Sequence, residues 1–264
     1  MTAATVDSAR DDADTGGGVR GLDRLLDAKG LLVAPLGIAA VAYGLFWLVD
    51  SKELSTVEER NLAWSVVRPQ ILDHLYLTFW STLLVIVIAV PLGILLTRPS
   101  YRRFSGPVLA VATSGQALPA YGLVVLAFAL MGRGQWSMIW ALVLFALLPV
   151  LRNTMVGLEQ VSASVIEAGR GMGLTKRQAL TKIELPLAVP VILAGVRTAL
   201  VINVGMATLG FLIGAGGLGI GISSGIKLSR ELVIVVYAGL TAVVALSVDW
   251  IAAIVERVLR PKGL

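Results

Sequence analysis

The chain lacks cysteine and has one histidine, His74, among 264 residues. Without cysteine there is no disulfide, no thiol nucleophile and no thiolate-bound metal, and a single histidine leaves almost no capacity for a zinc or iron centre. We therefore expect no metal, no cofactor and no catalytic residue. Charge is also scarce: Asp, Glu, Lys and Arg make up 15% of the residues, against about 25% in an ordinary soluble domain.

Apolar residues take the place of the missing charge, at 56% of the chain and a mean hydropathy of +0.84. A helix needs about 20 apolar residues to cross the hydrocarbon of a bilayer. Six stretches meet or approach this length: Leu31–Val49, Leu75–Thr97, Pro107–Met131, Gln135–Leu151, Pro186–Ile213 and Leu232–Val255. Their apolar residues are continuous rather than alternating, which favours helices over a barrel. The sequence thus predicts an all-α, polytopic membrane protein with about six transmembrane helices.

Residues 1–30 differ from the rest, because they are rich in aspartate and glycine and poor in apolar side chains. We expect a disordered cytoplasmic tail there, followed by one transmembrane domain over residues 31–264. With six spans, fifteen of the 22 Lys and Arg residues fall on the side of the N-terminus and six on the other side. This bias predicts a multi-pass protein of the cell membrane with both termini in the cytoplasm.

The predicted cytoplasmic loop over residues 152–185 has the features of a helical hairpin. Two capping boxes, Ser164–Glu167 and Thr175–Gln178, can each start a short helix. Glycines between them permit a sharp reversal, and Pro186 ends the second helix. Such a hairpin suits a groove on a soluble partner. It could equally be a surface connection that packs on its own bundle, and the pattern alone does not decide between the two.

The same loop resembles the EAA signature of permease subunits of bacterial ABC importers. The matching positions are Glu167, Ala168, Gly169 (where the family usually has a second alanine), Gly173, Ile183, Leu185 and Pro186. The resemblance implies the type I ABC importer permease fold. It also implies that this loop forms coupling helices that insert into ATPase subunits, with Glu167 assigned to docking.

From His74 to Val255 the chain looks like the osmoprotectant branch of these permeases, which imports glycine betaine, choline, carnitine or proline. Methionine-type permeases share the IGAGGLG ending, so an amino acid such as methionine is the alternative substrate. The resemblance implies four kinds of partner: two ATPase subunits, a second permease subunit that is a copy or a homologue, an extracytoplasmic substrate-binding protein and membrane lipid. No nucleic acid is expected.

A glycine-rich segment, Gly214–Gly219, satisfies the G-x-G-x-x-G pattern of dinucleotide-binding proteins but follows a membrane span instead of a strand. We interpret it as a close-packed turn near the outer gate of the transport pathway, with Gly214, Gly216, Gly217 and Gly219 as its key positions. No P-loop pattern occurs in the sequence. The chain is therefore expected to have no ATPase site of its own, and ATP would be hydrolysed by partner chains.

Five polar residues in or beside the spans are further candidates. Arg197 and Asp249 are charged residues inside spans, where a lone charge is expensive, so we expect Arg197 to face the protein interior and to pair with Asp249 or with a carbonyl. Asp249 could equally lie exposed at the inner boundary of its span. Asn203 and Thr208 either line the pathway or hydrogen-bond between helices. His74 is expected at the exposed outer boundary of its span.

Two other classes of membrane protein compete with the importer hypothesis. An ion-coupled secondary transporter usually carries several intramembrane carboxylates and inverted repeats, whereas we find one candidate carboxylate and no repeat. A polytopic membrane enzyme would need a cluster such as H-E-x-x-H or a paired nucleophile and base, and the sequence contains none.

Overall fold

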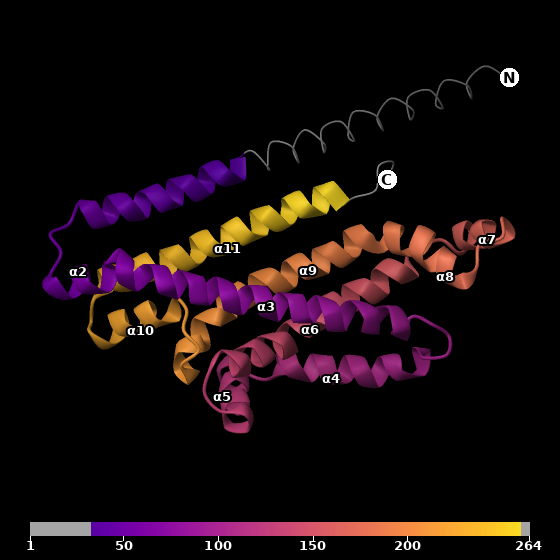
Figure 1. Cartoon of the computed structure of the whole chain (residues 1–264), viewed down its shortest axis with the longest axis horizontal. Helices are drawn as coiled ribbons and strands as arrows, with labels where there is room; N and C mark the ends of the chain where they lie inside the picture. Colours follow the sequence, from indigo (N-terminus) through magenta and orange to yellow (C-terminus); the bar gives the residue numbers. More distant parts are fainter. Residues whose placement is uncertain (1–32, 260–264) are drawn as a thin grey trace, which may run out of the picture.

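The computed structural model describes residues 33–259, and every regular element in this range is helical. Most helices run lengthwise, so the described part of the chain forms an elongated bundle (Figure 1). The tail expected over residues 1–30 lies outside the described residues. Long helices in a chain this apolar satisfy their own backbone groups, which is what a lipid environment requires.

Five helical stretches are long and apolar enough to cross a membrane: Val33–Asp50, α3 (Trp64–Leu96), α6 (Gln135–Glu159), Lys176–Ile213 and α11 (Glu231–Leu259). The stretch Lys176–Ile213 includes α9 (Leu185–Ala207). Several are longer than the spans expected from hydropathy; α3, for example, begins eleven residues before Leu75. Hydropathy marks only the apolar part of a helix, whereas the helix itself continues through polar residues at either end.

The predicted span Pro107–Met131 is not one straight helix. It consists of α4 (Ser105–Ala117), which follows a short 3-10 turn (Arg102–Phe104), and α5 (Ala120–Met131), at an angle of 104° to each other. Pro119 causes the break, because the residue before a proline avoids the helical region and Leu118 is extended, with ψ of 138°. The predicted number of about six spans is confirmed when this bent pair counts as one.

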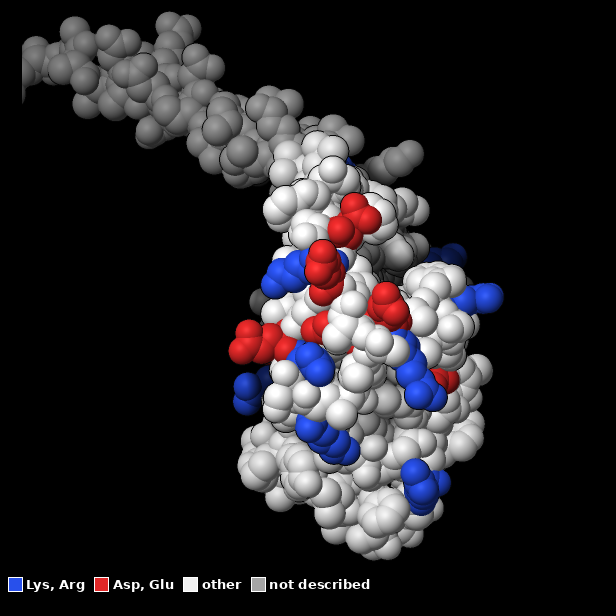
Figure 2. All heavy atoms as spheres, turned by 90° about the vertical axis from the view of Figure 1, so that its left-hand side faces the viewer, with Lys and Arg blue, Asp and Glu red and all other residues white. Residues whose placement is uncertain are grey.

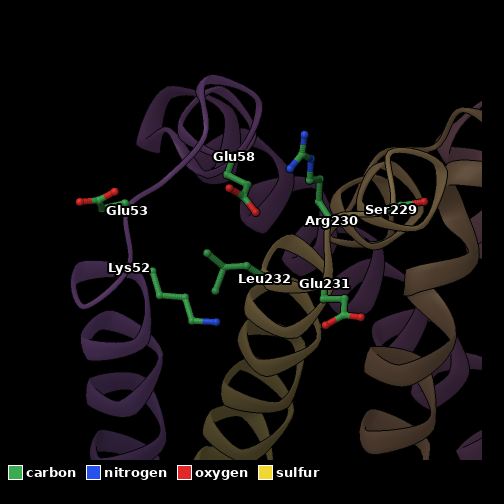
Figure 3. A pocket seen from close by; sticks show the side chains of 7 residues that line it. All are labelled: Lys52, Glu53, Glu58, Ser229, Arg230, Glu231 and Leu232. Atoms are coloured by element: carbon green, nitrogen blue, oxygen red, sulfur yellow. The ribbon is translucent and has the colours of Figure 1, made fainter.

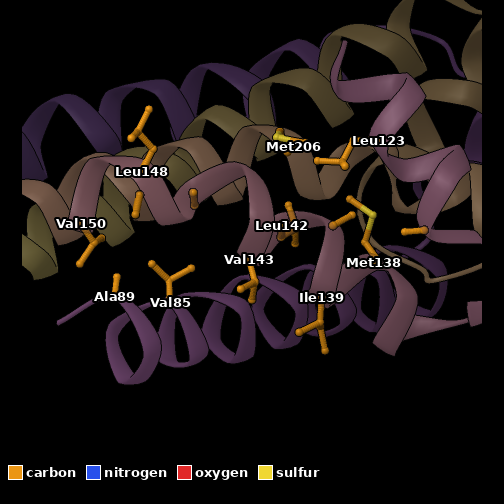
Figure 4. Close-up of a cluster of buried hydrophobic side chains, with 14 of the residues drawn as sticks. Val85, Ala89, Leu123, Met138, Ile139, Leu142, Val143, Leu148, Val150 and Met206 are labelled. Carbon is orange, nitrogen blue, oxygen red and sulfur yellow. The ribbon is translucent and has the colours of Figure 1, made fainter. Parts of the chain in front are cut away.

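The core lies where α3, α6 and α9 pack together, and Figure 4 shows part of it, with Ala89 near Val150 and Val85 near Val143. Small residues let these helices approach closely, since a Cβ on Gly93 would lie 2.8 Å from the Cβ of Thr154. This is the usual way in which membrane helices associate, because lipid offers no hydrophobic drive between them. The outward faces carry many exposed apolar side chains, as expected for contact with lipid or another subunit.

The two ends of the bundle are built differently (Figure 1). At one end, the hairpin end, lie α7 (Ala163–Gly171) and α8 (Lys176–Ala179), and a five-residue π-helix (Leu180–Glu184) leads from α8 into α9. At the opposite end, the turn end, lie α2 (Thr56–Leu62), a 3-10 turn (Thr208–Ile213) and α10 (Gly219–Lys227). The predicted hairpin and the predicted glycine-rich turn therefore lie at opposite ends of the molecule.

Candidate functional site

The hairpin expected over residues 152–185 is present but shorter. Helix α6 continues to Glu159, so the hairpin occupies residues 160–184. Gly173 makes the reversal with a φ of 93°, a conformation that side-chain-bearing residues rarely adopt. The predicted box at Thr175 is confirmed: its hydroxyl accepts from the backbone N–H of Gln178 (3.3 Å), and its own N–H donates to Gln178 Oε1 (2.9 Å).

The other predicted capping box, Ser164–Glu167, is wrong. Helix α7 starts at Ala163 and its N-cap is Ser162, so Ser164 already lies inside the helix. The hydroxyls of Ser162 and Ser164 hydrogen-bond to each other at 2.7 Å, and no side chain caps the helix start. Glu167, three residues after Ser164, therefore does not take part in a capping box, and it lies exposed on the helix surface.

The signature residues of the hairpin divide between its outer surface and its packed inner face. Glu167 and Ala168 are exposed, whereas Gly169 is buried against Ile183. A Cβ on Gly169 would overlap the Cδ1 atom of Ile183, so a residue without a side chain lets the two arms close on each other. Leu185, the first residue of α9, is half-buried and packs against a small apolar cluster, next to half-buried Pro186.

An ion pair that we did not anticipate joins the hairpin to the bundle. Arg98, just beyond the end of α3, donates from Nη2 to Oε2 of Glu184 at 2.6 Å. The Glu184 side chain is 8% exposed. The only sequence signal for this contact was a lone acidic residue among apolar neighbours, between Ile183 and Leu185, and it was insufficient to name a partner.

The glycine-rich segment forms the tight turn that we expected. Gly214, Gly216 and Gly217 have φ values of 68°, 90° and 91°, and a Cβ on Gly219 would overlap the carbonyl oxygen of Thr208. Backbone thus lies against backbone at this point. A helical 3-10 turn, not a strand, precedes the segment, so it lacks the context of a dinucleotide site.

His74 is not at an exposed boundary, and that prediction is wrong. Because α3 begins ten residues earlier, His74 lies in the third turn of the helix, and it is fully buried. Its Nε2 lies 3.0 Å from the carbonyl oxygen of Val204, and the backbone N–H of Leu218 donates to its Nδ1 at 3.4 Å. Both bonds form together only in the neutral tautomer with the proton on Nε2. His74 therefore ties α3 to the end of α9 and to the glycine-rich turn.

Other side chains surround the same turn, and none of them was predicted. The Asp73 carboxylate occupies the space beside Gly216, where a Cβ would lie 2.8 Å from its Cγ, and it accepts from Gln135 at 3.3 Å. The guanidinium of Arg133 lies beside Gly214. These residues come from α3, from the link between α5 and α6, and from the first position of α6, and nothing in their spacing along the sequence marks them as neighbours of the turn.

The remaining predicted residues do not gather at the turn. The expected pair is confirmed, since Arg197 binds Asp249 of α11 through both carboxylate oxygens, with Nη2 to Oδ2 at 2.6 Å. The Arg197 side chain is 41% exposed, so it does not face the protein interior as expected. Asn203 is buried and donates to Thr82 Oγ1 of α3 at 3.0 Å, whereas Thr208 Oγ1, just after α9, donates to the Gly205 carbonyl in the last turn of that helix.

The turn end carries an open surface pocket of ≈ 290 Å³ between two links (Figure 3). Residues around α2 and residues between α10 and α11 line it: Lys52, Glu53, Glu58, Ser229, Arg230, Glu231 and Leu232. The Ser55 hydroxyl and backbone N–H hold the pKa of Glu58 below its ordinary value. Figure 2 shows that charges of both signs are mixed over this end. Within residues 33–259, no group of three or more acidic or histidine side chains could hold a metal ion.

Comparison with known proteins identifies the fold and the family. The family model described as "binding-protein-dependent transport system inner membrane component" matches residues 89–261. An osmoprotectant import permease protein (OsmY) of Salmonella typhimurium is 43% identical over 188 residues, 71% of this chain and 80% of that protein. A glycine betaine/carnitine/choline transport system permease (OpuCB) of Bacillus subtilis is 37% identical over 192 residues, 73% and 88% of the two chains.

A solved structure agrees with these relatives. A chain of the inward-facing MetNI methionine ABC transporter superposes with a TM-score of 0.66 at 25% identity, over 74% of this chain and 96% of that chain. The predicted all-α permease fold is therefore confirmed, and the apolar helices have the length of membrane spans. The chain belongs to the inner membrane permease components of binding-protein-dependent ABC transport systems.

Proposed function

We propose that this permease carries a small osmoprotectant, such as glycine betaine, choline, carnitine or proline, into the cytoplasm, and that separate ATPase chains supply the energy. Two permease subunits form the pathway between them, and each inserts its hairpin, residues 160–184, into a groove of one ATPase subunit. The permease then acts as a lever between ATP hydrolysis and transport and has no catalytic site. The family membership and the protruding hairpin carry this proposal.

The surface of the hairpin supports docking to a soluble partner. Its outer side presents Glu167, Ala168 and Met172, and the Met172 side chain is 80% exposed. Its two arms are already closed on each other through Gly169 and Ile183. A preformed helical pair with an exposed face loses little conformational entropy when it enters a groove.

The orientation follows from the same assignment. If the hairpin faces the ATPase subunits in the cytoplasm, the turn end faces the outside, and both termini lie in the cytoplasm. The substrate-binding protein then docks at the turn end, on the links 50–73 and 214–231. Support comes from the pocket in Figure 3, because residues of both links line it together although they lie far apart in the sequence.

The substrate class rests on the relatives. Permeases named for osmoprotectants, glycine betaine, carnitine and choline are 35–43% identical to this chain, whereas the methionine transporter structure shares 25% identity with it. We therefore favour the osmoprotectant over methionine. An ion-coupled carrier and a membrane enzyme are less well supported than a binding-protein-dependent permease, because the family match covers residues 89–261.

The test uses the reconstituted complex of permease, ATPase and binding protein, and the variant Glu167→Ala. We expect membrane insertion to be normal and the ATPase activity stimulated by loaded binding protein to fall about tenfold, because an exposed docking carboxylate is lost. Glu159→Ala is the matched control, since Glu159 is exposed at the end of α6, just outside the hairpin. It should leave stimulation unchanged.

Two results would contradict the proposal. Normal stimulation in Glu167→Ala would remove the docking role of that residue, and a structure of the complex with residues 160–184 in contact only with lipid or solvent would remove the coupling role of the hairpin. The substrate is tested by binding of radiolabelled glycine betaine, choline, carnitine, proline and methionine to the cognate binding protein. Binding of methionine alone would reverse the substrate assignment.

A further inference from the structure

We infer that the Arg98–Glu184 ion pair transmits the movement of the hairpin to α3, and through α3 to the glycine-rich turn at the opposite end. The inference rests on the proposed coupling role of the hairpin and adds the residues by which its displacement leaves the hairpin. Arg98 and Glu184 are positioning residues in this scheme, because neither contacts a substrate or nucleotide.

The hairpin is continuous along the chain with α6 and with α9, and a charged contact attaches it to a third span, α3. Its second arm, α8, runs through the π-helix Leu180–Glu184 directly into α9. A π-helix is a rare widening of a helix that often marks functional positions. The last residue of this π-helix, Glu184, holds Arg98 of the α3 end at 2.6 Å. The junction between hairpin and span is therefore also the junction with α3.

The environment of the pair makes it a firm connection. The Glu184 side chain is 8% exposed and that of Arg98 33% exposed. The Arg98 guanidinium is oriented further by Nε, which donates to the Ile94 carbonyl at 3.3 Å. Ile94 in turn packs with Leu185 against the apolar cluster of α6 and α9. An ion pair that is shielded on one side and fixed at both residues is stronger and less mobile than an exposed surface pair.

Helix α3 can carry a displacement because it is one continuous helix of 33 residues, about 50 Å at 1.5 Å per residue. Its far end holds the glycine-rich turn through His74, which receives the Leu218 N–H and contacts the Val204 carbonyl. The Asp73 carboxylate lies beside Gly216 of the same turn. A shift or rotation of α3 at Arg98 therefore moves the contacts that fix the turn.

The physical requirement for such coupling is a difference in contact energy between the two transport states. A hairpin that tilts with its ATPase subunit moves Glu184, and the ion pair makes α3 follow instead of sliding past. Without the pair, the hairpin can still dock through its outer face, and its displacement still reaches α6 and α9 through the backbone, but the charged connection to α3 is lost. ATP hydrolysis then continues, but less substrate is transported per ATP hydrolysed.

The experiment compares Glu184→Gln, Arg98→Gln and the double exchange Arg98→Glu with Glu184→Arg in the reconstituted complex. Co-purified ATPase subunits, basal ATPase activity, thermal stability and the amount of radiolabelled glycine betaine transported per ATP hydrolysed are measured for each. Arg102→Gln is the matched control, because Arg102 is an exposed charge close in sequence to Arg98 and lies outside the hairpin. This control should behave as the unchanged protein.

We expect each single variant to retain its ATPase subunits and basal activity and to transport at least tenfold less substrate per ATP. The double exchange should recover at least part of that ratio, which a defect in folding alone would not show. An unchanged ratio in folded single variants would overturn the inference. Loss of the ATPase subunits from the single variants would also overturn it, since the pair would then serve docking. A failure of the coupling proposal itself is distinguishable, because Glu167→Ala would then leave stimulation normal.

Discussion

The hairpin end and the turn end of this permease differ in the atoms that make their closest contacts: side chains at the hairpin end and backbone at the turn end. At the hairpin end, α7 contacts the π-helix that follows α8 through the Ile183 side chain, which lies over Gly169, and Glu167, Ala168 and Met172 lie exposed. At the turn end, glycine backbone lies directly against other backbone, and His74 is fully buried within it. The hairpin contact is therefore made by a side chain, whereas the contacts of the glycine-rich turn are made by backbone atoms.

This difference shows what each end can tolerate. A side chain can change its rotamer, so contacts at the hairpin end can adjust when a partner binds or moves. Backbone packed on backbone has no such freedom, because a carbonyl oxygen cannot move without its helix. We therefore expect the turn end to respond to small substitutions with large losses of stability and the hairpin end with small ones. The predictions below test this contrast, from the largest expected effect to the smallest.

The largest effect is expected for Gly219→Ala at the turn end. The new Cβ would overlap the carbonyl oxygen of Thr208, and neither group can move away without displacing α10 or the preceding 3-10 turn. Overpacking typically costs about 1–3 kcal/mol, and we expect a loss at the upper end of this range because the overlapping atom belongs to the backbone. The midpoint of thermal unfolding of the purified protein should therefore fall by several degrees, and transport should be lost.

The control for this variant is Gly205→Ala in α9, where nothing lies within 4 Å of the new Cβ. Alanine in a helix is more favourable than glycine by up to about 1 kcal/mol, so the control should be as stable as the unchanged protein or slightly more stable. Equal midpoints for the two variants would show that the turn is less rigidly packed than the contrast requires.

A second, smaller effect is expected for substitutions of His74. Phenylalanine leaves the Leu218 N–H without its acceptor, and an unpaired buried N–H costs about 1–3 kcal/mol. Asparagine retains an acceptor near the Nδ1 position, and glutamine retains a donor near Nε2. Thermal unfolding should therefore rank His74→Phe as the least stable variant. If all three variants unfold at the same temperature, the two hydrogen bonds do not hold the turn.

The contrast also explains how much could be predicted from the sequence. Hydropathy located the spans, and the resemblance in residues 167–186 located the hairpin, because both signals are local. The box at Thr175 was predicted correctly for the same reason. The box at Ser164 failed because two serines, Ser162 and Ser164, compete for one helix start, and α7 takes Ser162 as its N-cap, two residues earlier than predicted.

Contacts between distant residues were mostly out of reach. The pairing of Arg197 with Asp249 could be anticipated, because two lone charges in apolar spans need each other. The partner of Glu184 could not, since Arg98 is one of many basic residues at the ends of helices. The burial of His74 was missed because the apolar run begins only at Leu75, whereas α3 begins at Trp64. His74 therefore lies within the helix and not at its exposed start.

Breaking the Arg197–Asp249 ion pair between α9 and α11 should cost less stability than Gly219→Ala and more than a substitution at the hairpin end. Arg197→Met leaves the Asp249 carboxylate unpaired, and a lone charge at the centre of a membrane helix costs about 2.5–3.5 kcal/mol. Both side chains are partly exposed, 41% for Arg197 and 29% for Asp249, so we expect a smaller loss, about 1–2 kcal/mol. Membrane levels and thermal unfolding of the purified protein measure it.

Its control is the double variant with Asp249→Leu, which removes the unpaired charge and should recover most of the lost stability. Arg257→Met provides a second control, because Arg257 is an exposed charge close to the end of α11. Normal membrane levels, stability and transport in Arg197→Met would show that the pair has no structural role.

The smallest effect is expected for Gly169→Ala at the hairpin end, the same chemical change as at Gly219. The new Cβ would overlap Cδ1 of Ile183, but this atom is the end of a flexible side chain that can rotate away. Alanine also favours α7 by up to about 1 kcal/mol relative to glycine. The two effects should nearly cancel, with a change in unfolding free energy within about 1 kcal/mol.

Adding Ile183→Val removes the overlapping atom and should make the double variant more stable than Gly169→Ala alone. A loss of unfolding free energy as large as that of Gly219→Ala would mean that the contact at Gly169 is as rigid as the contact at Gly219. The distinction between a side-chain contact that can adjust and a backbone contact that cannot would then have to be abandoned.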